Sequence, residues 1–596
     1  MSTETVEARA SDPILLAVIA NRLDSICREM TNTLLRSARS AVINMARDFS
    51  CSLVTADNQL LATAEGLPVH VIGSEFLAEA MTELHGDDLR EGDAYLHNDP
   101  YLGNTHSADH AILVPVFFDG QHMFTAVAKA HQADAGNSLP TTYMPGAKDV
   151  YDEGALNFPC VRVQREYANN MDIIRMCQRR IRVPEQWYGD FLAALGAARI
   201  AERGLKALCA QYGADRVKGL IAEWFDYSER RMTQAIKELP SGTLTGASTH
   251  DPYPGLPDGI PLGVKVNIDA EQGYIELDLR DNPDNYPGGL NESRACATAN
   301  TMIGLFNSID PDVPHNSGAF RRVKVLLREG CIAGIPKFPH SCSMATTNVA
   351  DRLVCLTQTS FAELGDGWGL AEGGMGMGPI MGVISGHDDR YGGQPYVNQL
   401  FVGSAGGPGS ATADGWPTYL IPVCASLIYK DSVEVDEQKY PIHVYEQRLV
   451  ADSEGAGRQR GGLGCRTVYG PKTAPVTVAY SCEAHHNPPK GVRGGLHGGR
   501  TDTWKLDADG NRVDIDLVGA LELQPGERIV SIGSGGGGYG EPLHRDPALV
   551  LHDVVEGWVS EERARSVYGV VLAGAGAELQ VDAEATRSCR AEGAQG

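Results

Sequence analysis

Two His-x-x-Asp segments lie close together in this chain, His106 to Asp109 and His131 to Asp134. Between them, two apolar runs flank the dipeptide Asp119-Gly120. Because both residues of that pair tolerate the positive φ of a type I′ turn, they predict a β-hairpin that joins the two segments. Imidazoles and carboxylates at both open ends of one hairpin are a pattern that can bind a metal ion.

The predicted hairpin register brings three of these side chains together. Counting back from a two-residue loop places Ala108 opposite His131 and Asp109 opposite Ala130. The ends converge, so we expect His106, Asp109 and His131 to come within reach of one ion. Two imidazoles and one carboxylate suit a divalent Zn, Mn or Fe ion and leave positions for water and substrate.

Other ionisable residues near this cluster are candidates for proton transfer. Asp99, His110 and Asp134 could orient the ligand imidazoles or accept a proton, and the alternative is that they cap local turns. Glu153, which follows Asp149 in the next loop, is a candidate general base if that loop folds over the hairpin mouth. The alternative for this acidic pair is a charge at the start of a helix. We predict Asp134, Glu153 and Asp99 as the catalytic residues.

The composition restricts the class of protein. The chain has 596 residues, with 51 Lys and Arg against 76 Asp and Glu, a formal net charge of −25. This charge argues against nucleic acid or an anionic membrane as a partner. No secretory signal is visible, no stretch approaches ~18 consecutive apolar residues, and the 13 cysteines form no C-x-x-C pair. We expect a cytoplasmic enzyme with reduced thiols.

Helices and a further hairpin must position the cluster. Apolar periodicity predicts a helix over 13–46, with Asp12 as its N-cap. A hairpin over 49–66 follows, with its turn around Ala56-Asp57-Asn58, then a helix near 74–85 and a helical block over about 170–238.

The rest of the chain is richer in glycine and in short strands. From 245 to 450 we expect short strands and a helix over 293–306, and from 451 onward a β-rich part that closes with a helix. The last ~20 residues read as a frayed tail. The fold class is therefore α+β, multi-domain and mixed, with three predicted domains: 1–240, which carries the metal-site hairpin, 241–450, and 451–596, which is Gly-rich.

Nucleotide and serine-nucleophile motifs are missing from the sequence. The run Gly533 to Gly540 formally satisfies G-x-G-x-x-G, but the residues after it cannot open a helix directly, which predicts a structural loop. Neither a G-x-x-x-x-G-K-[ST] phosphate loop nor a G-x-S-x-G elbow occurs. We therefore expect no nucleotide site in this chain.

Several collinear blocks resemble the hydantoinase B family, which also holds the large subunits of acetone and acetophenone carboxylases and the C-terminal part of 5-oxoprolinase. The resemblance is carried by HNDPYLGNTHSADHAILVPVF, AHQADAGN, DVYDEGALNFP, GRQRGGLG and GSGGGGYGEPLHRDPALVLHDVVEGW, among others. It implies a divalent metal held by His106, Asp109 and His131. One departure is Gln132, where many relatives have a second histidine.

The resemblance also implies a partner. A hydantoinase-A-type subunit with an actin-like fold would bind ATP and Mg and phosphorylate the substrate, in a hetero-oligomer with two copies of each subunit. A hydroxide on the metal of this chain would then attack the activated carbon. The expected reaction is the hydrolysis of a cyclic amide: a hydantoin, 5-oxoproline or a lactam.

Two other functions stay open at this point. The first is a subunit of an ATP-dependent ketone carboxylase, although the acetone-carboxylase relative is a longer chain. The second is a non-catalytic scaffold subunit in which the His/Asp cluster is structural. Oxygenase chemistry, which also uses two His and one carboxylate, has no further support in the sequence.

Overall fold

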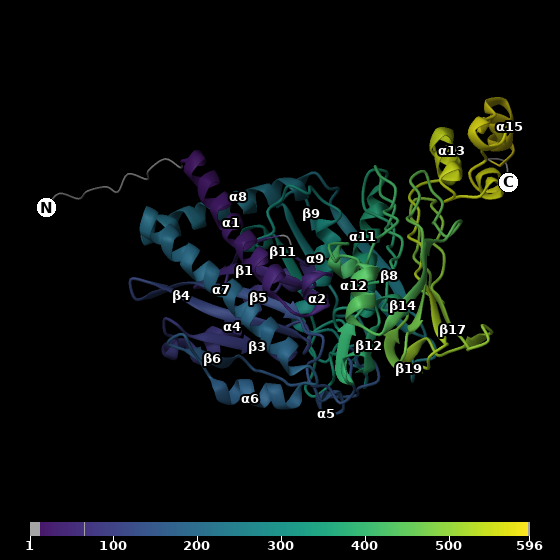
Figure 1. Ribbon diagram of the computed structural model, residues 1–596. Helices are drawn as coiled ribbons and strands as arrows, with labels where there is room; N and C mark the ends of the chain where they lie inside the picture. The colour runs from purple at the N-terminus through teal and green to yellow at the C-terminus, as the bar shows by residue number, and fades with distance from the viewer. Residues whose placement is uncertain (1–11, 65, 594–596) are drawn as a thin grey trace.

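The N-terminal part of the chain is built on a seven-stranded antiparallel sheet (Figure 1). A computed structural model describes residues 12–64 and 66–593. The strand order is β2-β1-β5-β4-β3-β6-β7. The strands are β1 (Phe49–Thr55), β2 (Leu60–Thr63), β3 (Ala94–His97), β4 (Asp109–Phe118), β5 (Gln121–His131), β6 (Val161–Arg165) and β7 (Ala168–Asn169).

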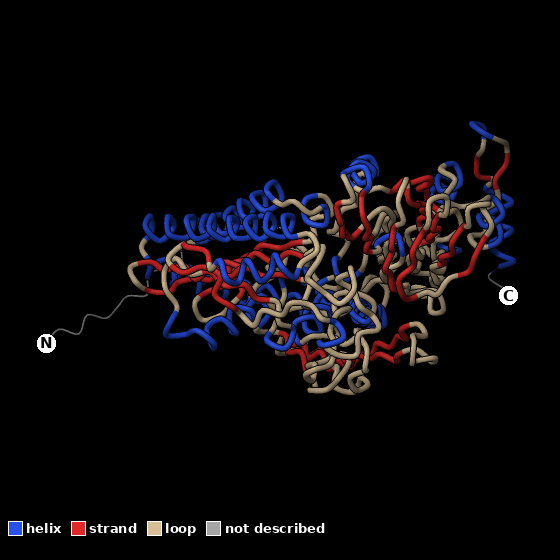
Figure 2. The backbone as a smooth tube through the Cα atoms, turned by 60° about the horizontal axis from the view of Figure 1, so that its bottom comes forward, coloured by secondary structure: helices blue, strands red, loops and turns tan. Residues whose placement is uncertain are grey.

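Helices cover both faces of this sheet. Ile112 and Val114 of β4 pack in the same core as residues of α1 and α7, whereas Ala111 and Leu113 pack with α4. Because β4 is covered on both faces, its sequence is a continuous apolar run. Figure 2 shows long helices lying along one side of these strands. The helices of this part are α1 (Pro13–Ser37), α2 (Ala41–Asn44), α3 (Pro68–Val71), α4 (Ser74–His85), α5 (Val150–Glu153), α6 (Met171–Arg180), α7 (Pro184–Tyr212) and α8 (Ala214–Lys237).

The predicted hairpin forms, but its register differs by one residue from the prediction. Asp119 and Gly120 have φ of 50° and 75°, as a type I′ turn requires. A β-bulge follows, because Phe117 pairs with His122 while Val116 pairs with Phe124. Met123 is the extra residue. From there to its open end the ladder is shifted, and Asp109 lies opposite His131 rather than Ala130.

A four-stranded sheet forms the core of the central part. Its order is β11-β10-β9-β8, and β10 and β11 run parallel. The helix α11 packs on α9, β8 and β9. The predicted helix over 293–306 is confirmed, since Ser293 caps α9 by accepting a hydrogen bond from the backbone N–H of Cys296. The elements are β8 (Gly242–His250), β9 (Ile260–Asp269), β10 (Tyr274–Asp278), β11 (Val323–Leu326), α9 (Arg294–Phe306), α10 (Ser317–Phe320) and α11 (Val349–Phe361).

Two further sheets follow, of four and five strands. Their orders are β13-β12-β16-β19 and β14-β15-β20-β17-β18. The four-stranded sheet joins strands from before and after residue 450, and the predicted three-domain division stays a prediction. The elements are β12 (Val383–Asp388), β13 (Gln394–Gln399), α12 (Val433–Lys439), β14 (Ile442–Leu449), β15 (Cys465–Pro471), β16 (Val476–Ser481), β17 (Asp502–Leu506), β18 (Arg512–Asp514), β19 (Val518–Leu523) and β20 (Arg528–Ile532).

Glycine-rich segments beside these sheets pack backbone against backbone. We call the segments 403–409, 453–464, 491–499 and 533–540 the glycine bundle. The N–H of Gly536 donates to the carbonyl of Gly462 (2.9 Å), whose own N–H donates to the carbonyl of Gly407 (2.8 Å). A Cβ on Gly536 would lie 1.9 Å from the Gly407 carbonyl oxygen. The run Gly533 to Gly540 is thus a structural loop, as predicted.

Two expectations about helices were wrong. The helix predicted over 13–46 ends at Ser37, because Ala38 adopts an extended conformation, and a short α2 follows. The predicted frayed tail instead contains β22 and α15, since Asp582 caps α15 by accepting from the N–H groups of Glu584 and Ala585. The last elements are α13 (Pro547–Val555), α14 (Glu561–Ser566), β21 (Leu572–Ala573), β22 (Gln580–Val581) and α15 (Ala583–Gly593).

The class predicted from the sequence, a multi-domain mixture of helices and sheets, is confirmed. None of the helices in the described ranges is long and apolar enough to cross a membrane.

Candidate metal centre

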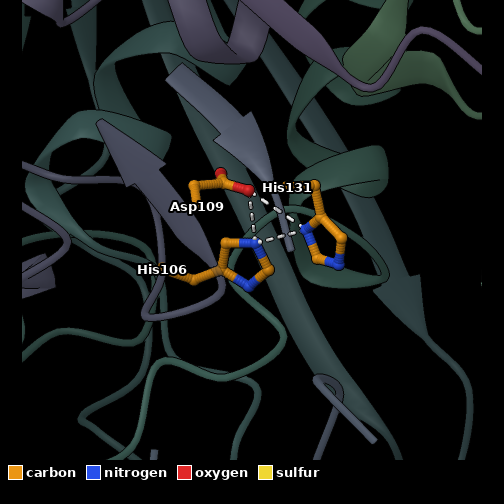
Figure 3. Close-up of side chains that lie close together, drawn as sticks. All are labelled: His106, Asp109 and His131. Carbon is orange, nitrogen blue, oxygen red and sulfur yellow. Dashed lines mark hydrogen bonds and ion pairs between the residues drawn. The ribbon is translucent and has the colours of Figure 1, made fainter. Parts of the chain in front are cut away.

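His106, Asp109 and His131 point toward one another at the open end of the β4–β5 hairpin (Figure 3). Nε2 of His106 lies 3.0 Å from Oδ1 of Asp109 and 3.2 Å from Nδ1 of His131. Nδ1 of His131 lies 3.1 Å from the same Asp109 oxygen. All three side chains are at most 1% exposed. The three predicted ligand residues therefore form one buried cluster.

The β-bulge at Met123 is what places two of these residues face to face. Residues directly opposite in an antiparallel pair project to the same face of the sheet, whereas a shift by one residue sends them to opposite faces. In the predicted register Asp109 and His131 would lie on opposite faces. With the bulge they are direct partners. The side-chain amide of Asn104 holds the loop from His106 to Asp109, because it donates to the carbonyls of His106 (2.8 Å) and Asp109 (2.9 Å).

The geometry of the cluster fits a bound divalent ion. Two ligand atoms ~2.1 Å from one ion lie roughly 3.0–3.4 Å apart, and the three observed separations agree with this. The ring nitrogens that face away are engaged elsewhere. Nδ1 of His106 donates to the Ser343 carbonyl (2.9 Å), and Nε2 of His131 lies 3.1 Å from Oγ1 of Thr142. These contacts leave one nitrogen of each ring directed at Asp109.

Charge pairing shifts the pKa values within the cluster. Burial alone would raise the pKa of Asp109, but His106 and His70 hold it well below its usual range. Burial alone would lower the pKa of His106, yet the Asp109 carboxylate raises it. The carboxylate is therefore ionised and ready to act as a ligand.

Sequence reasoning missed His70 and Asp48. Nε2 of His70 donates to Oδ2 of Asp109 at 3.1 Å, the oxygen that does not face the other two ligands, and lies 3.7 Å from Oδ1 of Asp48. Thr105 Oγ1 also donates to this Asp109 oxygen. His70 belongs to α3, far from the hairpin in sequence. Its only signal was a histidine within the otherwise apolar run Pro68-Val-His-Val71.

Two of the predicted catalytic residues make local contacts. Asp134 accepts from the backbone N–H of Arg182 (2.6 Å) and forms an ion pair with its guanidinium at 3.0 Å. Asp99 accepts from the backbone N–H of Tyr101 (2.9 Å) and so caps a turn. The structure does not bring either carboxylate into the ligand cluster, and their catalytic roles stay predictions.

The third predicted catalytic residue, Glu153, is buried near the cluster. It accepts a hydrogen bond from Ser341 Oγ (2.7 Å), two residues from the carbonyl that holds His106. Burial raises its pKa, in spite of the Ser341 and Ser107 hydroxyls. Asp149, by contrast, caps α5 by accepting from two backbone N–H groups.

His110 and Gln132 are buried and directly follow Asp109 and His131 in the chain. Nδ1 of His110 accepts from Nε1 of Trp187 (3.3 Å), and burial lowers the His110 pKa to about 3. The Gln132 side chain donates to the carbonyl of Ala130 (3.0 Å). Both side chains support the end of the hairpin.

Comparisons with known proteins identify the family and the fold. A family model described as Hydantoinase B/oxoprolinase matches residues 12–542, so the chain belongs to this family. The resemblance seen in the sequence is confirmed.

Individual relatives include subunits of several enzymes. The caprolactamase beta subunit of Pseudomonas jessenii is 33% identical over 596 residues, covering 97% of this chain and 99% of that protein. A putative D-/L-hydantoinase subunit of a Pseudomonas species (strain NS671) is 27% identical, covering 99% of this chain and 100% of that protein. The acetophenone carboxylase delta subunit of Aromatoleum aromaticum is 24% identical, covering 96% and 87%.

Solved structures show the same fold. A crystal structure of the ATP-dependent caprolactamase from Pseudomonas jessenii superposes with a TM-score of 0.86 at 29% identity, covering 98% of this chain and 100% of that one. These relatives are named as subunits of a caprolactamase, which a solved structure describes as ATP-dependent, of a hydantoinase and of an acetophenone carboxylase.

Proposed function

We propose that this chain is the metal-bearing subunit of a heteromeric, ATP-dependent enzyme of the cytoplasm that hydrolyses a cyclic amide: a hydantoin, 5-oxoproline or a lactam. The observation that carries the proposal is the buried cluster of His106, Asp109 and His131 in a chain that matches a caprolactamase subunit almost end to end.

The cluster has the groups that such a reaction needs. A Zn, Mn or Fe ion held by Nε2 of His106, Oδ1 of Asp109 and Nδ1 of His131 would supply Lewis acidity and lower the pKa of a coordinated water. The surrounding protein fixes these ligands and excludes solvent. The Tyr143 ring stacks on His131 with centroids 5.2 Å apart and an interplanar angle of 15°.

Glu153 is the best placed of the predicted proton carriers. Its raised pKa favours delivery of a proton to the leaving ring nitrogen, and the Ser341 hydroxyl orients the carboxyl group. Asp134 and Asp99 would contribute by holding the loops on either side of the cluster.

ATP would be bound by a hydantoinase-A-type partner. The sequence has no phosphate-binding loop, and the caprolactamase relative is named as a beta subunit of an ATP-dependent enzyme. The partner would phosphorylate the amide oxygen, which makes the ring carbon electrophilic, and this chain would complete the ring opening.

Reconstitution with the partner tests the proposal. The chain and its ATP-binding subunit are purified as a complex, and ATP hydrolysis is measured with a panel of cyclic amides. We expect ATP hydrolysis that depends on a cyclic amide and yields the ring-opened amino acid. If no member of the panel stimulates ATP hydrolysis, the proposal is wrong.

A ketone carboxylase is the second candidate, because the acetophenone carboxylase delta subunit covers 96% of the chain. Labelled bicarbonate supplied with ATP and a ketone would then label the product.

A scaffold role is tested by elemental analysis, since a scaffold subunit purified without chelator would contain no stoichiometric transition metal.

A further inference from the structure

An apolar chamber with a volume of about 620 Å³ adjoins α3, the helix that carries His70. It lies between α3, α9 and the turn at 425–427, and its size is typical of small-molecule sites. The lining residues are Thr63, Ala64, Gly66, Pro68, Val71, Ile72, Ile303, Phe306, Asn307, Ile309, Pro311, His315, Ala425 and Leu427.

The lining residues that the structure describes carry no formal charge. None of these residues is Lys, Arg, Asp or Glu. Burial lowers the pKa of His315, so its imidazole is neutral at pH 7, and its ring packs edge-on against Phe306 with centroids 4.4 Å apart. The amide of Asn307 donates to Gln358 (3.0 Å), and the Thr63 hydroxyl donates to the carbonyl of Ala64 (2.9 Å). The polar groups of the lining are therefore largely engaged.

One turn of helix separates the chamber from the metal ligands. Pro68 and Val71 of α3 line the chamber, while His70 between them donates to Oδ2 of Asp109 at 3.1 Å. The ligand cluster itself is at most 1% exposed, so a substrate needs an opening, and α3 is the element that contributes both to the chamber lining and to the contacts of Asp109.

We propose that this chamber receives the hydrocarbon part of an uncharged cyclic substrate, and that it selects an alkyl lactam over 5-oxoproline. The inference rests on the proposed function for the reaction at the metal centre. A carboxylate placed in an apolar chamber without a positive partner loses its hydration, and a hydantoin would bury two carbonyls and two N–H groups. An unsubstituted lactam buries a methylene chain instead, which is favourable.

Direct binding is the first test. The purified complex without ATP is titrated calorimetrically with ε-caprolactam, hydantoin and 5-oxo-L-proline. We expect affinity to fall in that order, with caprolactam at least ~10-fold tighter than 5-oxoproline. Equal or tighter binding of 5-oxoproline would overturn the proposal.

A charge placed at the rim of the chamber is the second test. Leu427 is 44% exposed, so Leu427→Arg can be accommodated without disturbing the core. Leu496→Arg is the matched control, since Leu496 is also 44% exposed and does not line the chamber. We expect Leu427→Arg to raise KM for caprolactam ~10-fold with little change in kcat, and to tighten 5-oxoproline binding. Leu496→Arg should change neither.

The outcomes separate this inference from the proposed function. If the complex hydrolyses a lactam but Leu427→Arg behaves like Leu496→Arg, the chamber is not the recognition site although the enzyme class stands. If no cyclic amide is hydrolysed but caprolactam binding still depends on Leu427, the chamber proposal holds and the reaction is a different one. If Leu427→Arg instead abolishes association with the ATP-binding subunit and leaves lactam affinity unchanged, the chamber is a docking surface and the proposal fails.

Discussion

Around the metal centre, polar side chains fill the space between secondary-structure elements, whereas in the glycine bundle the backbones touch one another directly. The single carboxylate of Asp109, for example, is contacted by three imidazoles, those of His106, His131 and His70. In the glycine bundle, the N–H of Gly455 donates to the Gly536 carbonyl (2.8 Å) with no side chain between the two segments.

This difference shows two ways to bury polar groups. In the metal centre, side-chain donors and acceptors are paired with one another, and removing one partner leaves a costly orphan. In the glycine bundle the backbone groups pair with each other, and the favourable terms are hydrogen bonds and close van der Waals contact. We therefore expect the removal of a side-chain group to disrupt the metal centre, and the addition of a side-chain atom to disrupt the glycine bundle.

Loss of a ligand imidazole is the largest effect that we expect. His106→Ala removes one of the three ligand atoms, so metal content and turnover should both collapse, turnover by ~10³-fold or more. Metal analysis and lactam-dependent ATP hydrolysis measure the two effects. ATP binding by the partner should persist. The control is His122→Ala on the same hairpin, where the imidazole contacts Thr125 and the Phe117 ring and not the ligand cluster. A metal-free His106→Ala protein with full activity would contradict the assignment.

Addition of one methyl group tests the glycine bundle. Gly536→Ala places a Cβ 1.9 Å from a backbone oxygen, and backbone cannot swing aside. We expect a loss of ~3 kcal/mol or more in the free energy of unfolding, measured by urea denaturation. In Gly196→Ala the new Cβ meets nothing within 4 Å, and this helical position should gain ~0.5–1 kcal/mol. If the two variants have similar stability, the glycine bundle is not sensitive to an added atom, and the contrast with the metal centre is wrong.

His70 should affect the metal centre without being a ligand. His70→Ala leaves Thr105 as the remaining donor to Oδ2 of Asp109 and so loosens the carboxylate, and the metal affinity should fall ~10–100-fold, measured by chelator competition. His70→Gln keeps an N–H donor and should recover most of the affinity. If the alanine variant binds metal as tightly as the parent chain, His70 does not position Asp109.

Buried carboxyl groups outside the metal centre give an effect that is spread over several pH units. Burial and the neighbouring Asp431 raise the pKa of Asp436 to about 9, from an ordinary value of 3.8. Between these two values the folded chain holds a proton that the unfolded chain releases, so stability falls as pH rises, by up to ~1.4 kcal/mol per pH unit. Asp436→Asn should flatten this slope between pH 5 and 8, as urea denaturation at several pH values would show. An unchanged slope would mean that Asp436 does not titrate there.

Local features of the sequence predicted much of the fold. Asp119-Gly120 predicted the hairpin, and Asp12 predicted the start of α1, where it accepts from the Leu15 N–H. These signals depend on residues that are close together in the sequence, so they can be recognised from the sequence alone.

The features that were missed depend on distant contacts. The bulge at Met123 has no sequence signature, because either register keeps apolar residues on both buried faces. His70 joins the metal centre only through tertiary packing of α3. The composition of the last residues favours a helix, but sequence reasoning treated them as a frayed tail because they end the chain.

The close packing of Gly533 to Gly540 has a consequence at the level of the genetic code. Every single-nucleotide missense change of a glycine codon introduces a residue with a Cβ, and at Gly535, Gly536 and Gly537 that atom would meet backbone oxygens at 1.7, 1.9 and 2.1 Å. We therefore expect no viable one-step missense neighbours at these codons. In a library made by error-prone replication, this stretch should return only synonymous changes, while the surface helices accumulate variation.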